Sequence, residues 1–365
     1  MRRVKYLWLQ VARGVAALGV LFFHVSTCWQ EIAWMAPVVA AAHWGFFGVD
    51  IFFVLSGFVI AASITRKQGQ ADALQFLALR FARIYLGYWP ALLLFVAVAW
   101  YVNGVSLPLE KAWQSVFLLS GKIENHWLAI AWSLFFELYF YALAALLIAR
   151  VSPEKRALAI SVAMAVIAAW NAGWLVLNAE TVQAGLQPRR DVLSGLVLEF
   201  LMGCLLYELR HLCSFSALKI LNLSSLVVVT FAVGTFSHWF DKIEVLRVGS
   251  FGLSAAALIA VALCLEDSPY RPWRWLVLTG DSSYALYLTH IVVISLAVTA
   301  STSLFIGTRL YTLNLLLIPL YAWLFAAAWY RWLEHPLYEA AKGRLSALFA
   351  PHGSDGLVSR DTRGS

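Results

Sequence analysis

The chain has 365 residues, of which 62% are apolar and only 13% are charged. Water-soluble domains carry about 25% charged residues, so this composition excludes an ordinary soluble domain. The net charge is +7. Because the basic residues follow a membrane-topology pattern rather than one basic face, we expect membrane lipids and not nucleic acid as partners.

Long apolar stretches follow one another along the whole sequence. A transmembrane helix needs about 20 mostly apolar residues. The sequence predicts about ten such helices, at residues 7–29, 43–63, 84–102, 127–149, 157–177, 192–209, 220–239, 248–265, 282–301 and 310–330. The predicted fold class is therefore all-α, a polytopic bundle of membrane helices.

The distribution of Lys and Arg predicts the orientation of this bundle. With a cytoplasmic N-terminus, most of the 27 Lys and Arg residues fall in the cytoplasmic breaks, as the positive-inside rule requires. Both termini are then cytoplasmic. The breaks are too short for a second domain, so residues 1–342 form one membrane domain and residues 343–365 form a polar, disordered tail.

Two ionisable residues lie on one face of the first predicted helix. Arg13 and His24 are eleven residues apart, which returns almost to the same face about 16 Å further along the helix. Ionisable groups inside a membrane are costly and commonly functional. The alternatives are that Arg13 reaches lipid phosphates and that His24 only bonds a neighbouring carbonyl.

Two carboxylates lie within apolar helices. Asp50 interrupts the run from Phe46 to Phe58, and Glu137 lies near the middle of the fourth predicted helix. A buried carboxylate requires a partner, and Arg13 or a histidine is the natural candidate for Asp50. Glu137 is expected to pair with an arginine, orient a histidine or hydrogen-bond to Tyr141.

An amphipathic segment precedes the third predicted helix. It carries Arg80 and Arg83 at positions i and i+3, on one face. Two guanidinium groups so placed suit phosphate groups. The alternative is an ordinary surface helix in contact with anionic lipid.

Other polar features near the C-terminus are interpreted as architecture. Tyr287 and His290 share a face of the ninth predicted helix, and Pro336 is expected to stop the tenth at the cytoplasmic surface. No soluble-enzyme motif is present, and the histidines do not have metal-ligand spacing, so no metal site is predicted.

An ordered set of motifs resembles the membrane-bound acyltransferase 3 superfamily, whose members O-acylate bacterial polysaccharides and other acceptors. The resemblance covers residues 8–340 and is strongest to the branch that modifies exopolysaccharides. Tyr85 departs from it, because many relatives have proline there. The motifs are R-G-x-A at 13–16 followed by His24, G-V-D-I-F-F-V-L-S-G-F at 48–58, R-x-x-R-I at 80–84, W-S-L-x-x-E at 132–137, S-Y-x-L-Y-L-x-H at 283–290 and E-x-P at 334–336.

The resemblance implies a bacterial inner-membrane enzyme that uses acetyl-CoA or another acyl-CoA as donor. The acceptor would be a hydroxyl of a glycan or a lipid-linked saccharide. The resemblance implies that His24 is the catalytic histidine and that Arg13 is a buried charge needed for activity. It assigns Arg80 and Arg83 to donor binding.

Two mechanisms follow for His24. It acts as a general base on the acceptor hydroxyl, with Asp50 or Glu137 orienting its ring, or it forms a transient acyl-histidine. Two other functions remain open at this point: a secondary transporter, because intramembrane charges also mark ion pathways, and a non-catalytic protein of glycan export.

Overall fold

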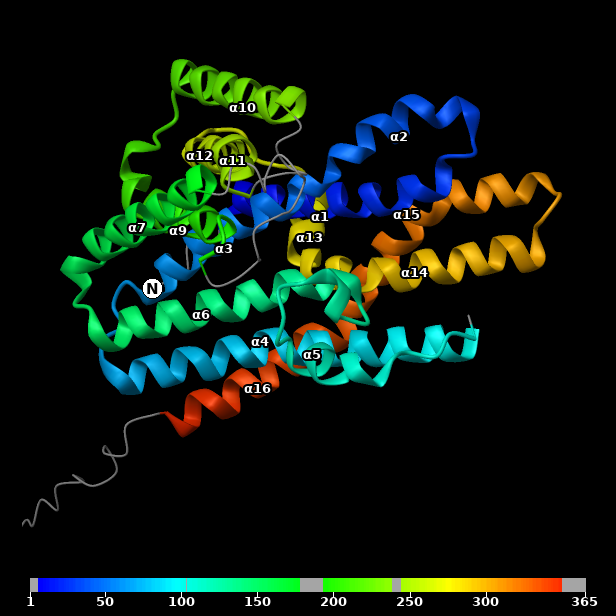
Figure 1. Cartoon of the computed structure of the whole chain (residues 1–365), viewed down its shortest axis with the longest axis horizontal. Helices are drawn as coiled ribbons and strands as arrows, with labels where there is room; N and C mark the ends of the chain where they lie inside the picture. The colour runs from blue at the N-terminus through cyan, green and yellow to red at the C-terminus, as the bar shows by residue number, and fades with distance from the viewer. Residues whose placement is uncertain (1–5, 103, 178–192, 238–243, 350–365) are drawn as a thin grey trace, which may run out of the picture.

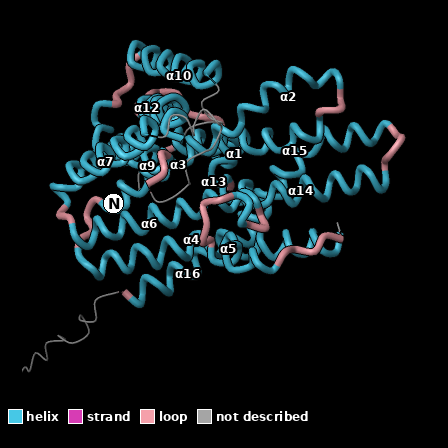
Figure 2. Tube along the Cα trace, in the orientation of Figure 1, coloured by secondary structure: helices cyan, strands magenta, loops and turns pink. Residues whose placement is uncertain are grey.

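A computed structural model describes residues 6–102, 104–177, 193–237 and 244–349, and every regular element in these ranges is helical (Figures 1 and 2). The α-helices are α1 (Leu7–Val25), α2 (Ala36–Ala42), α3 (Phe47–Ile64), α4 (Gly69–Ala97), α5 (Ala112–Phe117), α6 (Trp132–Arg150), α7 (Arg156–Leu177), α9 (Leu196–Glu208), α10 (Ala217–Ser237), α11 (Glu244–Arg247), α12 (Leu253–Glu266), α13 (Arg274–Asp281), α14 (Ser283–Leu304), α15 (Arg309–Trp329) and α16 (His335–Leu348).

Nine helical segments in the described part of the chain are long and apolar enough to cross a membrane. They are Leu7–Trp29, Ala33–Ile64, Gly69–Val102, Ala129–Arg150, Pro153–Leu177, Ala217–Ser237, Val248–Glu266, Ser283–Leu304 and Leu310–Leu348. Nine of the ten predicted helices overlap these segments. The all-α membrane bundle is thus confirmed, whereas the cytoplasmic position of both termini stays a prediction.

The sixth predicted helix has a different form. Its described part is α9, which has only 13 residues and is buried along most of its length. Helix α9 packs closely against α3: a Cβ added at Gly57 would lie 1.9 Å from the Phe200 carbonyl oxygen, and one at Gly203 1.8 Å from that of Val54. An apolar helix enclosed by protein has the same sequence pattern as one in lipid, so composition alone overestimated its length.

Helix α1 lies at the centre of the molecule and contacts α3, α12, α13 and α14 (Figure 1). Its first turn has no capping side chain of its own. Glu266 at the end of α12 accepts hydrogen bonds from the backbone N–H groups of Leu7, Trp8 and Leu9, at 3.0, 2.6 and 3.1 Å. This carboxylate satisfies donors that a helix N-terminus leaves free, and so fixes α1 against α12.

Helices α4, α6 and α16 lie side by side along one edge of the bundle (Figure 1). Helix α4 continues without a break through Tyr85, whose hydroxyl donates to the Phe117 carbonyl at 2.9 Å. The departure from proline at this position therefore leaves the helix intact, and Pro90 lies further along in the same helix.

The C-terminal helices correct two predictions. Helix α15 passes through one π-helical turn, Tyr330–Glu334, directly into α16. Pro336 does not stop the helix: it lies in the first turn of α16, where its missing N–H group costs little. The predicted disordered tail from residue 343 is helical as far as Leu348, and residues 350–365 lie outside the described residues.

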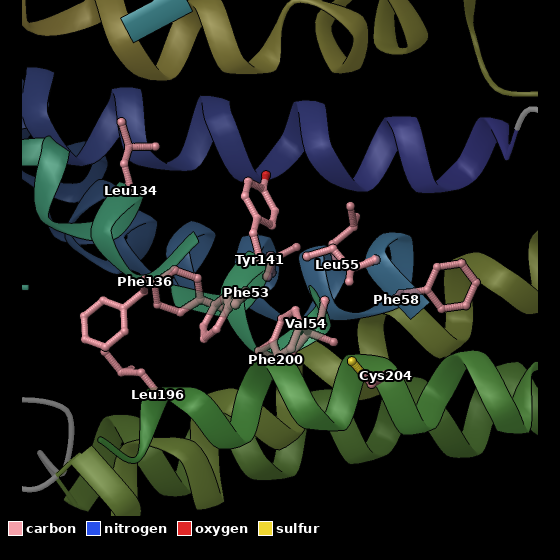
Figure 3. Close-up of a cluster of buried hydrophobic side chains, with 14 of the residues drawn as sticks. Phe53, Val54, Leu55, Phe58, Leu134, Phe136, Tyr141, Leu196, Phe200 and Cys204 are labelled. Carbon is pink, nitrogen blue, oxygen red and sulfur yellow. The ribbon is translucent and has the colours of Figure 1, made fainter. Parts of the chain in front are cut away.

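The core between α3, α6 and α9 is aromatic (Figure 3). Phe140 stacks on Phe200 with ring centroids 4.2 Å apart, and Phe53 meets Phe140 edge to face at 5.5 Å. Such ring pairs add about 0.5–1.5 kcal/mol each beyond the burial of their area. This packing fixes α6, and with it the polar face that carries Glu137 and Tyr141.

Candidate functional site: a cationic cavity and a histidine pair

A cavity of about 180 Å³ lies between α1, α3, α4, α6 and α14. Its walls combine apolar side chains of α3 with an unusual number of polar groups. The polar residues that line it are Arg13, Ser56, Arg80, Arg83, Ser133, Glu137, Tyr141, Ser283, Tyr284 and Tyr287. The structure thus brings four of the six predicted site residues, the three arginines and Glu137, to one place.

Arg83 is held by a residue from the far end of the chain. Its guanidinium donates to Glu334 Oε1 at 2.7 Å, and Glu334 is 1% exposed. The guanidinium carbon also lies 5.3 Å from the ring centres of Tyr284 and Tyr338. Glu334 is the last residue of the π-helical turn before α16, so the ion pair joins this turn to α4.

Arg80 is positioned differently. It donates to the Ser63 hydroxyl at 2.9 Å, and its guanidinium carbon lies 5.5 Å from the Tyr141 ring centre. A hydroxyl and a ring face orient a guanidinium without neutralising it. These contacts hold the Arg80 guanidinium at the cavity wall, where Glu137 attracts it through space.

The Arg13 guanidinium makes fewer contacts with described side chains than those of Arg80 and Arg83. Among the described residues, its hydrogen bond is one long contact of 3.4 Å to Gln10 Oε1. Its charge is balanced through space by Glu334, Asp281 and Glu137, while nearby Arg83 repels it. An arginine with unused donors beside a cavity is suited to an anionic or carbonyl oxygen of a ligand.

Glu137 and Ser283 complete the polar wall. The Ser56 hydroxyl donates to Glu137 Oε1, so a serine of the α3 motif fixes this carboxylate. Tyr141, one helical turn further, extends its hydroxyl toward α1 (Figure 3). The Ser283 hydroxyl is fully buried, lines the cavity and has no hydrogen-bond partner among the described residues. A buried polar atom without a partner is costly, so this hydroxyl is available to a water or a ligand in the cavity.

Asp50 lies away from this cavity, and its expected pairing with Arg13 or a histidine is wrong. Its two oxygens accept hydrogen bonds from Arg247 Nε and Nη2, at 2.8 and 2.7 Å. Asp50 is fully buried, and Arg247 also covers the ring of Phe46. This two-pronged ion pair joins α3 to α11, so Asp50 neither contacts nor orients the His24 ring.

His24 lies in the last turn of α1, beyond the residues that line the cavity. Its Nδ1 is 2.9 Å from the Val20 carbonyl oxygen and 3.2 Å from Nε2 of His290 on α14. His290 is 1% exposed, and its Nδ1 lies 3.0 Å from the Leu286 carbonyl oxygen. The two imidazoles therefore form a contact pair in which neither Asp50 nor Glu137 takes part.

One layer of side chains connects the pair to the cavity. Tyr287, which lines the cavity, has its ring centre 6.1 Å from that of His290. Its hydroxyl donates to the Ile130 carbonyl at 3.0 Å and is 2.7 Å from the Ser133 hydroxyl. A cationic compartment and an imidazole pair are thus adjacent along one side of α1 and α14.

Three further residues, which are not among the predicted site residues, lie at or beside this site. They are His290, Ser283 and Glu334, which lie in the motifs at 283–290 and 334–336. A polar or charged side chain in apolar surroundings, the criterion that selects Arg13 and His24, is the sequence signal that could have found them. Across the part of the chain that the structure describes, no three potential metal ligands converge.

These features define a multi-pass membrane protein with its polar site inside the helical bundle. A family profile described as an acyltransferase domain matches residues 6–332, which is most of the chain. The chain therefore belongs to this acyltransferase family, as the motif resemblance had indicated.

Curated relatives agree with the family. The chain is 28% identical over 311 residues to the exopolysaccharide production protein ExoZ of Rhizobium meliloti, covering 81% of this chain and 90% of that protein. It is 23% identical over 382 residues to the O-acetyltransferase OatA of Staphylococcus aureus, covering 93% and 58%. It is 26% identical over 329 residues to the putative peptidoglycan O-acetyltransferase YrhL of Bacillus subtilis, covering 78% and 48%. The chain thus spans about half the length of the latter two, and no solved structure matches it.

Proposed function

We propose that this protein is an acyl-CoA-dependent O-acetyltransferase of the bacterial inner membrane. Its acceptor is a hydroxyl of an exported glycan or of a lipid-linked saccharide. The observation that carries the proposal is the convergence of Arg13, Arg80 and Arg83 on one cavity beside the pair His24–His290. The similarity to ExoZ, an exopolysaccharide production protein, supports a polysaccharide as acceptor.

The chemistry of the cavity fits part of an acyl-CoA donor. At about 180 Å³ it is smaller than the roughly 300–1,000 Å³ of pockets that enclose drug-sized ligands. It therefore suits the thioester end of a pantetheine arm rather than the nucleotide. Within the described residues Arg13 has unused donors and the Ser283 hydroxyl has no partner, and these groups match the amide and carbonyl oxygens of such an arm.

The reaction requires a base at the acceptor hydroxyl. Nε2 of His24 removes the hydroxyl proton as the oxygen forms a bond to the thioester carbonyl carbon. The carbon–sulfur bond then breaks, and the proton leaves with the thiolate as free CoA. Transfer through an acyl-histidine uses the same nitrogen as nucleophile and differs in its order of steps.

The test is transfer of radiolabelled acetyl groups from acetyl-CoA to endogenous polysaccharide in inverted vesicles of the source bacterium. A strain that lacks the gene is complemented with the wild-type protein, with His24→Ala, or with a matched control, His211→Ala, whose side chain is exposed. We expect full transfer with the control and loss of at least 10²-fold with His24→Ala at equal membrane levels. Undiminished transfer by His24→Ala would overturn the assignment, and solute uptake without any acyl donor would favour a transporter instead.

A further inference from the structure

The protonation pattern of the histidine pair can be read from its acceptors. A backbone carbonyl only accepts hydrogen bonds, so a ring nitrogen beside it must carry a proton. Nδ1 of His290 faces the Leu286 carbonyl at 3.0 Å and Nδ1 of His24 faces that of Val20 at 2.9 Å. Both neutral rings therefore carry their proton on Nδ1, which leaves Nε2 of each ring as an acceptor.

The contact between the rings then has a direction. The His290 Nε2 lone pair faces the Nδ1–H group of His24 at 3.2 Å. His24 thus donates one proton to two acceptors, the Val20 carbonyl and His290. No described residue bonds its Nε2, which is available to a substrate. In soluble hydrolases a buried carboxylate occupies the place that His290 occupies here.

We infer that His290 is the positioning residue of the proposed transfer reaction. Together with the Val20 carbonyl it holds the Nδ1–H tautomer and ring orientation of His24, and it stabilises the imidazolium that forms when His24 Nε2 takes the acceptor's proton. This inference rests on the proposed function and replaces the carboxylate partner expected from the sequence. His290 does not exchange a proton with substrate: it accepts a hydrogen bond that becomes charge-assisted as the ring of His24 gains its positive charge.

A neutral acceptor suits this location better than a carboxylate would. His290 is 1% exposed and packs against the rings of His24 and Tyr287. A permanent negative charge there would carry a large desolvation cost, which a neutral imidazole avoids. The rigid helix α14 keeps its Nε2 in place, since Nδ1 is bonded to the turn before it.

Two substitutions separate hydrogen-bond acceptance from packing. His290→Gln places an amide oxygen close to the position of Nε2, whereas His290→Leu fills similar volume with no acceptor. In the vesicle assay with radiolabelled acetyl-CoA, we expect His290→Leu to lower the maximal rate about 10- to 10²-fold, with KM for acetyl-CoA unchanged. We expect His290→Gln to recover most of that rate.

The controls distinguish the possible failures. The amount of each variant in the membrane and its thermal stability are measured as well. If His290 had a merely structural role, these two quantities would fall together with the transfer rate. Wild-type rates in His290→Leu, or equal losses in both variants, would overturn the positioning role. If the positioning role of His290 failed but His24→Ala lost transfer in the same assay, the proposed function would still stand. If His24→Ala kept transfer, the proposed function itself would fail.

Discussion

Arg83 and Glu334 lie 251 residues apart in the sequence and form a 2.7 Å ion pair at the cavity wall. The carboxylate is almost fully buried, and the pair joins α4 to the π-helical turn before α16. The E-x-P motif thus has a local role in the helix junction and a long-range role in holding a cavity arginine. Both roles depend on the same turn.

Glu334→Ala is expected to destabilise the protein because it leaves Arg83 without its partner. Removing one member of a buried pair costs about 3–5 kcal/mol. Because the Arg83 side chain is 22% exposed and water can reach it, we expect a loss of stability at the lower end of this range. Lys342→Ala breaks the exposed pair with Glu339 on the same helix and should cost at most about 1 kcal/mol. Thermal unfolding of both variants in detergent checks this, and equal stability of the two would contradict it.

Asp50→Ala is expected to impair folding rather than chemistry. The substitution leaves the Arg247 guanidinium without its two-pronged partner inside the bundle, which costs about 3–5 kcal/mol. The melting temperature in detergent should therefore fall, while folded protein keeps its rate of acetyl transfer per molecule. A variant of unchanged stability that loses transfer would return Asp50 to a catalytic role.

Alanine at Gly57 or Gly203 should disrupt the contact of α3 with α9. The added methyl group would lie within 2 Å of a backbone carbonyl oxygen in either case, so the helices must separate. Overpacking of this kind costs about 1–3 kcal/mol. Gly173→Ala is the matched control, since nothing lies within 4 Å of its added Cβ. Melting temperatures that fall equally in all three variants would contradict the close packing.

Ser283→Ala separates ligand binding from stability. Because the hydroxyl is buried and has no partner in the described structure, its removal should leave the melting temperature unchanged or raise it slightly. If the hydroxyl bonds the donor, the dissociation constant for acetyl-CoA should rise about 5- to 10-fold. Unchanged affinity would place Ser283 outside the donor site.

Helical content and the approximate limits of the long helices followed from hydrophobic patterning, because the cost of unpaired backbone groups in lipid leaves few alternatives. The arginines and Glu137 could also be chosen from sequence, since charges in apolar helices are rare. The partners of these charged residues could not be predicted from the sequence. Asp50 had two plausible cationic partners on spacing alone, and only the folded chain brings Arg247 to it.

The helix ends were also less predictable. Pro336 is a strong stop signal locally, but a π-helical turn rotates the chain so that the proline begins a new helix. His290 shows the same limit at the site: its position on α14 was evident, whereas its contact with His24 depends on how α1 and α14 pack.

Equilibrium binding of acetyl-CoA to the purified protein tests the central claim, that the cavity beside α1 receives the acyl donor, most directly. The wild-type protein is compared with Arg13→Ala and with Arg271→Ala, a control in an exposed loop. We predict saturable binding that weakens at least 10-fold in Arg13→Ala, from the loss of a charge-assisted hydrogen bond, and that is unchanged in Arg271→Ala. Equal affinity in all three proteins would contradict the claim.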